Sequence, residues 1–234
     1  MTGAGRAFCA GAELSQGGKT FDFKAQGSED EMETWVDAGG TVALRIYNMK
    51  KLVIAAINGP AAGGGLTLTL PMDIRLASEE AKLVFPFTRR GIVLESCSSW
   101  FLPRIVGISR AADLILSGRV ISAKEAFAYG LVNEIVAPDA LINRAREIAL
   151  ETARNTSAIS VALCRQLLWK MLGAEHPKEA YKIESRCLYW AGNKADAREG
   201  VGSFLEKRPA NFTMKASSEM PEFYPWWAER PFDK

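Results

Sequence analysis

The first half of the chain carries short apolar runs that turn signals separate. The run at 52–57 is typical of a buried strand, and the sequence predicts two further buried strands at 73–77 and 83–85. Asn58-Gly59-Pro60 closes the first run as a turn. Residues 66–72 have helical character. Strands that alternate with a helix indicate an α/β architecture.

Helical spacing of apolar residues dominates after residue 95. Ser122 and Glu125 have the spacing of a capping box, which opens a helix that ends near Gly130. Apolar residues between 31 and 50 also recur near helical spacing, but Gly39-Gly40 interrupts them, which predicts one kinked helix or two short ones. The remaining predicted elements are helices at 98–106, 109–116, 141–155, 157–172, 178–190 and 195–205 and a strand at 132–136.

These patterns divide the chain into two regions. Residues 1–136 hold the predicted strands and form a core domain, and residues 137–234 form a helical C-terminal region with an aromatic, proline-rich tail at 221–227. The polar, glycine-rich stretch 15–31 is predicted to be a surface loop.

Composition excludes several classes of protein. The chain has 234 residues, 48% hydrophobic and 24% charged, which is an ordinary globular balance. The net charge of +2 lacks the basic excess of a nucleic-acid binder. No apolar run approaches the roughly 20 residues that cross a membrane. We therefore expect neither a nucleic-acid partner nor a membrane partner.

Cysteine and histidine usage argues against a metal site and a histidine-dependent nucleophile. The four cysteines have no C-x-x-C spacing, and the one histidine, His176, lies in a loop-like stretch. We expect no metal, and we expect the cysteines to be buried free thiols of a reducing, intracellular compartment.

Two segments built from small residues are candidates for ligand binding, at 5–14 and 55–65. Backbone N–H groups in such loops approach a ligand closely, and two loops that converge on one oxygen form an oxyanion hole. Simple turns are the alternative. A Rossmann phosphate loop is a further one, although the G-x-G-x-x-G pattern is absent.

The two segments resemble elements of the enoyl-CoA hydratase/isomerase (crotonase) superfamily. Phe8-Cys9-Ala10-Gly11-Ala12-Glu13-Leu14 looks like its F-x-A-G-A-D-L element, and the segment from Ala55 to Gly65 looks like its A-A-v-n-G-x-A-x-G-G-G element. Further similar segments follow in the same order, namely 73–77, 102–107, 116–126, 130–136 and 198–209. The resemblance covers nearly the whole chain up to about Phe212.

The resemblance implies a fold and a ligand. The expected fold is α/β, a crotonase-like (ClpP/crotonase) spiroid ββα core with a helical C-terminal region that mediates trimerisation. The expected ligand is an acyl-CoA thioester, whose carbonyl oxygen the backbone N–H groups of Ala12 and Gly64 would hold. Ala10, Gly11 and Gly63 fall in the matching substrate-binding loops. No cofactor is implied, because CoA is part of the substrate, and the expected assembly is a homo-trimer or hexamer.

The catalytic side chains depart from the hydratase pattern. Hydratases carry two glutamates at positions that here hold Thr67 and Phe87. One acid remains, because the segment 89–99 resembles that of 3,2-enoyl-CoA isomerases and places Glu95 at their catalytic glutamate. One carboxylate can take a proton from C2 and return it to C4, and an apolar pocket would suit it. Phe85, Phe87 and Trp100 are the candidate walls.

Several alternatives stay open. The leading hypothesis is an enoyl-CoA isomerase of fatty acid metabolism, and the others are an atypical hydratase or dehydratase (a lyase) and a non-catalytic acyl-CoA-binding scaffold. Family members usually carry further strands before the F-x-A-G-A-D element, so we expect the N-terminus to be truncated, and an inactive fragment is the last alternative. Peroxisome, mitochondrion and cytoplasm are not distinguished.

Overall fold

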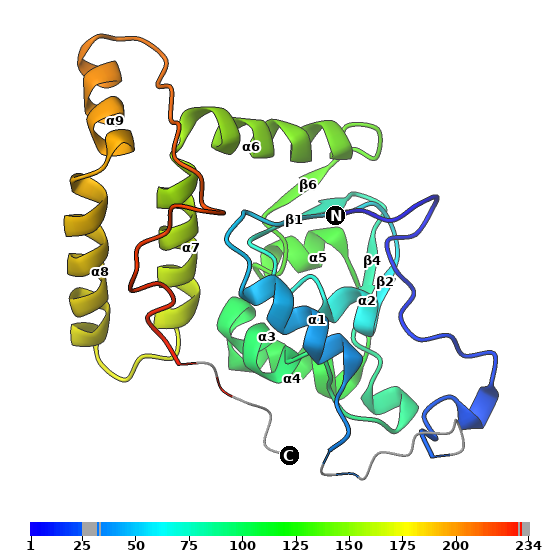
Figure 1. Cartoon of the computed structure of the whole chain (residues 1–234). Helices are drawn as coiled ribbons and strands as arrows, with labels where there is room; N and C mark the ends of the chain where they lie inside the picture. Colours follow the sequence, from blue (N-terminus) through cyan, green and yellow to red (C-terminus); the bar gives the residue numbers. More distant parts are fainter. Residues whose placement is uncertain (25–31, 33, 229, 231–234) are drawn as a thin grey trace. The chain divides into compact units, whose positions relative to one another are not determined.

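The computed structural model describes residues 1–24, 32, 34–228 and 230, and the chain folds as two compact units (Figure 1). Unit 1 comprises Met1–Tyr47 and Val53–Ala145. Unit 2 comprises the short segment Asn48–Leu52 and the chain from Arg146 to Pro231. The strands and the candidate site lie in unit 1.

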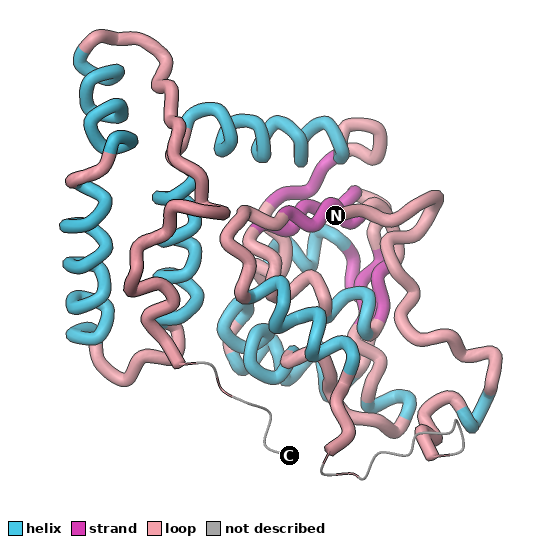
Figure 2. The backbone as a smooth tube through the Cα atoms, viewed as in Figure 1, coloured by secondary structure: helices cyan, strands magenta, loops and turns pink. Residues whose placement is uncertain are grey.

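Unit 1 contains two small sheets, drawn in magenta in Figure 2. In the first, β3 lies between β1 and β6 and pairs with both in parallel. In the second, β4 pairs in parallel with β2 and antiparallel with β5. The strands are β1 (Ile54–Ile57), β2 (Ala61–Ala62), β3 (Ile74–Ser78), β4 (Lys82–Val84), β5 (Val120–Ser122) and β6 (Glu134–Val136). Every residue of β1 is buried, as expected for a strand that helices cover on both sides.

Helices follow the strands throughout unit 1. They are α1 (Ala38–Tyr47), α2 (Gly64–Thr67), α3 (Ser98–Val106), α4 (Ile108–Ser117), α5 (Ala123–Ala128) and the start of α6 (Leu141–Asn155). Two 3-10 turns lie at Gly17–Lys19 and Thr88–Arg90. The strands and helices of unit 1 together bury a core that includes Ile57, Leu66, Leu83 and Phe101, each at most 2% exposed.

Most predicted elements are confirmed. The four predicted strands are β1, β3, β4 and β6, and the helices at 98–106, 141–155 and 195–205 have the predicted bounds. The predicted helix at 66–72 is wrong in extent, because α2 ends at Thr67 and hydrogen-bonded turns continue to Met72. Strands β2 and β5 were not predicted, since elements of two and three residues are too short to show an alternating pattern.

The prediction of a kinked or divided helix between 31 and 50 is wrong. One helix, α1, begins at Ala38, so Trp35 and Val36 lie before it, and residues 31 and 33 lie outside the described residues. The Asp37 carboxylate accepts hydrogen bonds from the backbone N–H of Gly39 (2.9 Å) and of Gly40 (2.7 Å). This is N-cap geometry, so the two glycines form the first turn of α1 instead of interrupting a helix.

The buried Arg75 fixes the chain that follows α2. Its guanidinium donates to the backbone carbonyl oxygens of Met72 (2.6 Å) and Leu131 (2.7 Å), and it is 5% exposed. Burial lowers the pKa of Arg75 to about 10, which still leaves the side chain charged at neutral pH. Carbonyl groups that no strand or helix satisfies are thereby paired inside the core.

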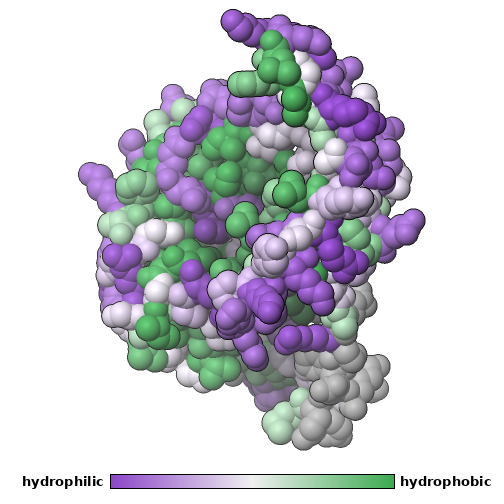
Figure 3. Space-filling model, turned by 90° about the vertical axis from the view of Figure 1, so that its left-hand side faces the viewer, coloured by the Kyte–Doolittle hydropathy of each residue, from purple (hydrophilic) through white to green (hydrophobic). Residues whose placement is uncertain are grey.

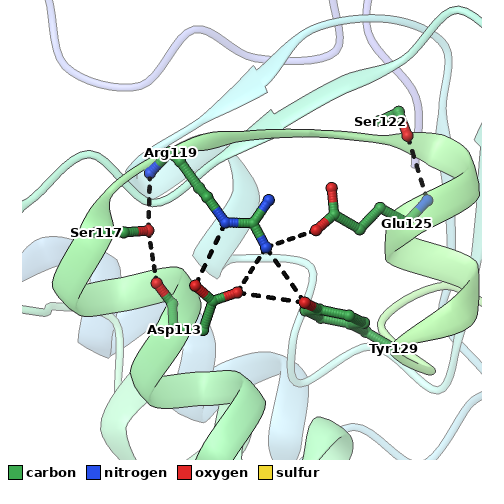
Figure 4. Close-up of polar contacts among 6 residues, drawn as sticks. All are labelled: Asp113, Ser117, Arg119, Ser122, Glu125 and Tyr129. Atoms are coloured by element: carbon green, nitrogen blue, oxygen red, sulfur yellow. Dashed lines mark hydrogen bonds and ion pairs between the residues drawn. The ribbon is translucent and has the colours of Figure 1, made fainter.

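A polar cluster joins α4, β5 and α5 (Figure 4). Arg119 pairs with Asp113 and with Glu125, each at 2.5 Å, and donates to the Tyr129 hydroxyl at 3.2 Å. Ser122 caps α5 by accepting from the backbone N–H of Glu125, but the Glu125 side chain binds Arg119. The predicted capping box is therefore confirmed for the serine half.

Acidification is expected to remove the contribution of this cluster to the free energy of unfolding. Hydrogen bonds from Arg119 hold the pKa of Asp113 and of Glu125 below their ordinary values of 3.8 and 4.5. A carboxyl whose pKa is lowered by folding stabilises the protein above its unfolded pKa, and this stabilisation is lost as the pH falls through the folded pKa. Unfolding midpoints of wild type and Arg119→Met should therefore differ at neutral pH and converge below about pH 3.

The exposed Arg90 provides the matched control for this experiment. Arg90→Met removes the same charge and the same number of donors without touching the cluster, so its midpoint should follow that of the wild type at every pH. A difference between Arg119→Met and wild type that persists unchanged at acid pH would contradict the assignment.

Unit 2 is helical. Its elements are the remainder of α6, then α7 (Ala158–Met171), α8 (Pro177–Gly192) and α9 (Ala195–Leu205). Helices α7 and α8 bury Ile159, Leu163 and Cys187. The aromatic tail packs on this cluster through residues that include Phe223, Tyr224 and Trp226.

The segment Asn48–Leu52 is held within unit 2 by polar contacts. The Met49 carbonyl accepts from the side chains of Arg165 (2.5 Å) and Gln166 (2.8 Å), and Lys50 donates to the carbonyl of Ala216 (3.2 Å). The Lys170 ammonium lies 4.3 Å from the centroid of the Trp227 ring. Unit 2 is therefore assembled from two stretches of chain that are far apart in the sequence.

Helices α8 and α9 expose large apolar side chains. Figure 3 shows hydrophobic residues in green on the face of the molecule that it presents. The most exposed large apolar side chains of α8 and α9, each at least 63% accessible, are Tyr181, Leu188, Tyr189, Val201, Phe204 and Leu205. Exposed apolar side chains that gather in one patch are typical of interaction surfaces.

The four cysteines differ in burial. Of the four cysteines, Cys187 alone is buried, whereas Cys9 and Cys164 are exposed and Cys97 is intermediate, so the prediction of four buried thiols is wrong.

Among the described residues, no helix combines the length and the apolar character that a membrane span requires.

Candidate active site

The first small-residue segment lies beside β2. Cys9 forms a parallel bridge with Ala61, and the Cys9 carbonyl accepts from the backbone N–H of Ala62 at 2.9 Å. The chain then turns at Gly11, whose φ of +82° favours glycine. A Cβ on Gly11 would lie 2.6 Å from the Ala62 oxygen and 3.6 Å from the Gly64 nitrogen. The Gly11–Ala12 turn therefore lies directly against the start of α2.

The second small-residue segment forms the N-terminus of α2. Gly63 is the N-cap, with φ 51° and ψ −127°, and its N–H donates to the Val84 carbonyl at 3.1 Å. The Gly63 carbonyl accepts from the N–H groups of Leu66 and Thr67, each at 2.9 Å. Within the described part of the chain, the N–H groups of Ala12 and Gly64 have no backbone or side-chain acceptor. They are available donors on two adjacent loops, as an oxyanion hole requires.

Glu95 lies at the same place. A Cβ on Gly64 would lie 3.8 Å from Glu95 Oε2 and 3.9 Å from Oε1. Glu95 as a residue is partly exposed. The structure thus brings together Gly11, Gly63, Gly64 and Glu95 from three segments of the sequence.

Two hydroxyl groups hold the Glu95 carboxylate. The Thr67 hydroxyl donates to Oε1 at 2.5 Å, and the Ser96 hydroxyl donates to Oε2. The Glu95 backbone carbonyl accepts from the Ser98 hydroxyl at 2.6 Å and from the Ser98 N–H at 2.9 Å. Both oxygens of the carboxylate therefore accept a hydrogen bond from a neutral donor.

The start of α1 supports the turn that follows Glu95. Ser96 and Cys97 have φ values of 55° and 56°, a left-handed conformation that non-glycine residues adopt only at some cost. Asp37, the N-cap of α1, accepts from the backbone N–H of Ser96 at 2.7 Å. A Cβ on Gly39 would lie 2.5 Å from Glu95 Oε2, so only glycine leaves room for the carboxylate. Strain of this kind gathers at functional sites.

Cys97 stays a thiol in this environment. Burial, and after it the nearby carboxylates of Asp37 and Glu95, raise the pKa of Cys97 above its ordinary value. A thiol with a raised pKa is a poor nucleophile. Cys97 therefore packs beside the site and does not attack a substrate.

The three aromatic residues predicted to form the walls of the pocket differ in burial. Phe85 and Phe87 are 1% and 3% exposed, so both rings belong to the core of unit 1. Trp100, on α3, is partly exposed, and its ring contacts Tyr47, Phe101 and Arg104. Ala10 is exposed next to Gly11. No Lys or Arg pairs with Glu95 within the described ranges.

Sequence reasoning missed three residues that shape the site, Asp37, Gly39 and Ser96. The signal for Asp37 was present, because an aspartate immediately before a helix is a typical N-cap. The closeness of Gly39 to Glu95 had no sequence signal, since 56 positions separate the two residues in the numbering. Thr67 was considered only as the place of an absent glutamate, yet its hydroxyl contacts Glu95.

The arrangement combines the carboxylate of a partly exposed glutamate with available N–H donors on two loops. Such a site can remove a proton from a carbon beside a carbonyl group while the N–H groups stabilise the negative charge that develops on the carbonyl oxygen.

Comparisons with known proteins identify the family of the chain. The sequence matches the family described as "Enoyl-CoA hydratase/isomerase" over residues 1–215. It is 44% identical to "Enoyl-CoA hydratase ACTT3" of Alternaria alternata, over 91% of this chain and 69% of that protein. It is 33% identical to the "1,2-epoxyphenylacetyl-CoA isomerase" of Escherichia coli, over 92% of this chain and 80% of that protein.

Solved structures give the same result for the fold. A probable enoyl-CoA hydratase/isomerase from Mycobacterium abscessus matches with a TM-score of 0.80 and 31% identity, over 92% of this chain and 80% of that one. An enoyl-CoA hydratase from Bacillus anthracis matches with a TM-score of 0.80 and 34% identity, over 90% and 79%. The predicted crotonase-like α/β fold is confirmed. The chain belongs to the enoyl-CoA hydratase/isomerase family, the crotonase superfamily that its sequence motifs resemble.

Proposed function

We propose that the chain is an enoyl-CoA isomerase that moves a double bond from C3 to C2 of an acyl-CoA thioester, with Glu95 as its single proton carrier. The observation that carries the proposal is the position of the Glu95 carboxylate beside the N–H donor Gly64. The two positions at which hydratases carry glutamates hold Thr67 and Phe87, and neither side chain transfers a proton near neutral pH.

The proposed reaction balances without a cofactor. The Glu95 carboxylate takes a proton from C2, and the electron pair moves onto the thioester oxygen, which accepts hydrogen bonds from the N–H groups of Ala12 and Gly64. The enolate then collapses, the C2–C3 double bond forms, and Glu95 delivers the same proton to C4. One group acts as base and then as acid, so a second carboxylate is unnecessary. CoA enters and leaves as part of the substrate.

The second candidate function is the addition of water to a 2-enoyl-CoA. The name of the Alternaria alternata relative, an enoyl-CoA hydratase, favours it. In this reaction Glu95 would activate a water molecule and also supply a proton to C2. The isomerase reaction requires fewer roles of a single carboxylate, because Glu95 returns the same proton that it has removed and activates no water molecule.

Turnover of a 3-enoyl-CoA in heavy water tests the proposal. The expected product is a 2-enoyl-CoA, whose mass differs from that of the substrate only by exchanged deuterium. A 2-enoyl-CoA is supplied in a parallel reaction, and its conversion to a 3-hydroxyacyl-CoA without any shift of the 3-enoyl-CoA would support the hydratase instead. A folded chain that binds acyl-CoA but gives no shift, no hydration and no C2 exchange would be a scaffold.

We propose further that copies of the chain associate through unit 2, as a homo-trimer or a pair of trimers. The exposed apolar side chains of α8 and α9 support association, because water contact with such a surface is unfavourable. Light scattering tests this proposal, and a monomeric mass at micromolar concentration would overturn it.

A further inference from the structure

We propose that Thr67 is a positioning residue of this site, whose hydroxyl fixes the orientation of the Glu95 carboxylate for the two proton transfers. This inference rests on the proposed function, because it assumes that Glu95 carries the proton. Thr67 itself is not a proton carrier, since a hydroxyl does not titrate near neutral pH.

The contact is short and lies in a fixed setting. Thr67 Oγ1 lies 2.5 Å from Glu95 Oε1, within the range of a hydrogen bond to a charged oxygen. The Thr67 side chain is fully buried, and its backbone N–H donates to Gly63 within the turn that presents the N–H of Gly64. The residue that orients the carboxylate and the residue that offers the N–H donor therefore belong to the same four-residue helix, α2.

The Thr67 hydroxyl lies within hydrogen-bonding distance of two acceptors. Its other acceptor is the Gly64 carbonyl at 3.2 Å, the bond to the residue three positions earlier that threonine often makes in a helix. The bond to Glu95 is the shorter by 0.7 Å, by subtraction of 2.5 Å from 3.2 Å. A charged acceptor attracts the proton more strongly than a carbonyl does. The hydroxyl therefore turns to Glu95 while the carboxylate is ionised.

Hydrogen bonds that do not involve the Thr69 side chain hold the segment around Thr67. Arg75 binds the carbonyl oxygen of Met72 at 2.6 Å, and the backbone N–H groups of Leu66 and Thr67 bind the Gly63 carbonyl, each at 2.9 Å. Thr67 and Thr69 are both 0% exposed. A donor on such a segment restricts a glutamate side chain, which otherwise rotates about three bonds.

The orientation matters because one carboxylate serves two carbons. Each carboxylate oxygen has two lone-pair directions, and the Thr67 hydroxyl occupies one on Oε1 and leaves the other open. Without the Thr67 hydroxyl, Glu95 is still present, but its carboxylate is less well oriented toward C2 and C4 of the substrate. A misplacement of about 1 Å costs about 100-fold in rate. A glutamate at position 67 would instead set a second negative charge beside Glu95 and repel it.

The test compares Thr67→Val with Thr69→Val in the full chain. Each substitution removes one buried threonine hydroxyl, and the two sites lie two residues apart. Thr67→Val should lower kcat for a 3-enoyl-CoA by about 10- to 100-fold and change KM by less than about twofold. Thr69→Val should leave kcat unchanged and lose similar stability, because its hydroxyl binds only a backbone carbonyl.

Thr67→Ser restores the hydroxyl and should return kcat to within about threefold of wild type. If Thr67→Val does not fold, Thr67→Ala replaces it, with Thr67→Ser as the comparison. Equal kcat in wild type and Thr67→Val or Thr67→Ala would overturn the inference. So would a loss of kcat in Thr67→Ser as large as that in the variant without a hydroxyl. Activity that survives Glu95→Gln overturns the proposed function itself, whereas an inactive Glu95→Gln beside a fully active Thr67→Val overturns this inference alone.

Discussion

Glu95→Gln is expected to lower kcat/KM for a 3-enoyl-CoA by about 10²- to 10⁴-fold, the usual contribution of one acid–base group. Glutamine has the shape of glutamate, and its amide oxygen still accepts from Thr67, but the amide does not carry a proton. Steady-state kinetics and deuterium exchange at C2 both measure the loss. Exchange should fall together with turnover, because removal of the C2 proton is the step that fails.

The matched control for this variant is Glu80→Gln. Glu80 is exposed in the turn between β3 and β4, so the same loss of charge occurs away from the site. It should keep wild-type kinetics. A folded Glu95→Gln enzyme that retains more than about a tenth of wild-type kcat/KM would remove Glu95 from the mechanism.

Gly64→Pro is expected to lower kcat/KM by about 10²- to 10³-fold, the cost of losing one oxyanion donor. Gly64 is the first residue of α2, and proline is favoured at this position because its fixed φ suits a helix start. The substitution therefore deletes one N–H with little disturbance of the helix. The thermal midpoint of the variant, compared with that of wild type, checks the fold.

Gly64→Ala separates the lost N–H from the added side chain. Alanine keeps the N–H, and its Cβ would lie no closer than 3.8 Å to the Glu95 carboxylate, an ordinary contact. We expect Gly64→Ala to stay within about tenfold of wild type. If Gly64→Pro and Gly64→Ala have the same kcat/KM, the Gly64 N–H does not stabilise the enolate.

The backbone loops of the site and Glu95 could be predicted from the sequence, and the side-chain contacts of Glu95 could not. Gly11 and Gly63 mark conformations that other residues avoid, so the sequence itself carries the signal. The strand β1 was likewise predictable, because it is a continuous apolar run that the core covers. Short-range patterns are sufficient where the physical cause is local.

The contacts of Glu95 have no local cause. Thr67 precedes Glu95 by 28 positions, and Asp37 precedes Ser96 by 59. Only the pairing of β2 with β4 and the packing of α1 bring these segments together. The same argument applies to α1. Helical spacing alone predicted that Gly39 and Gly40 interrupt a helix, whereas the cap formed by Asp37 places both glycines in the first turn of α1.

The Gly11–Ala12 turn and the start of α2 present main-chain N–H groups, and this has a consequence for sequence drift. A main-chain donor persists with every side chain except that of proline, so other substitutions at position 12 leave the proposed oxyanion contact intact. Glu95 has no such freedom, because its carboxylate would carry the proton, and Gly39 has none, because a Cβ there would displace that carboxylate. Relatives of this chain can therefore exchange the residues that meet the acyl group while the proposed backbone donors stay in place, so under this proposal new substrates are easier to acquire than new reactions.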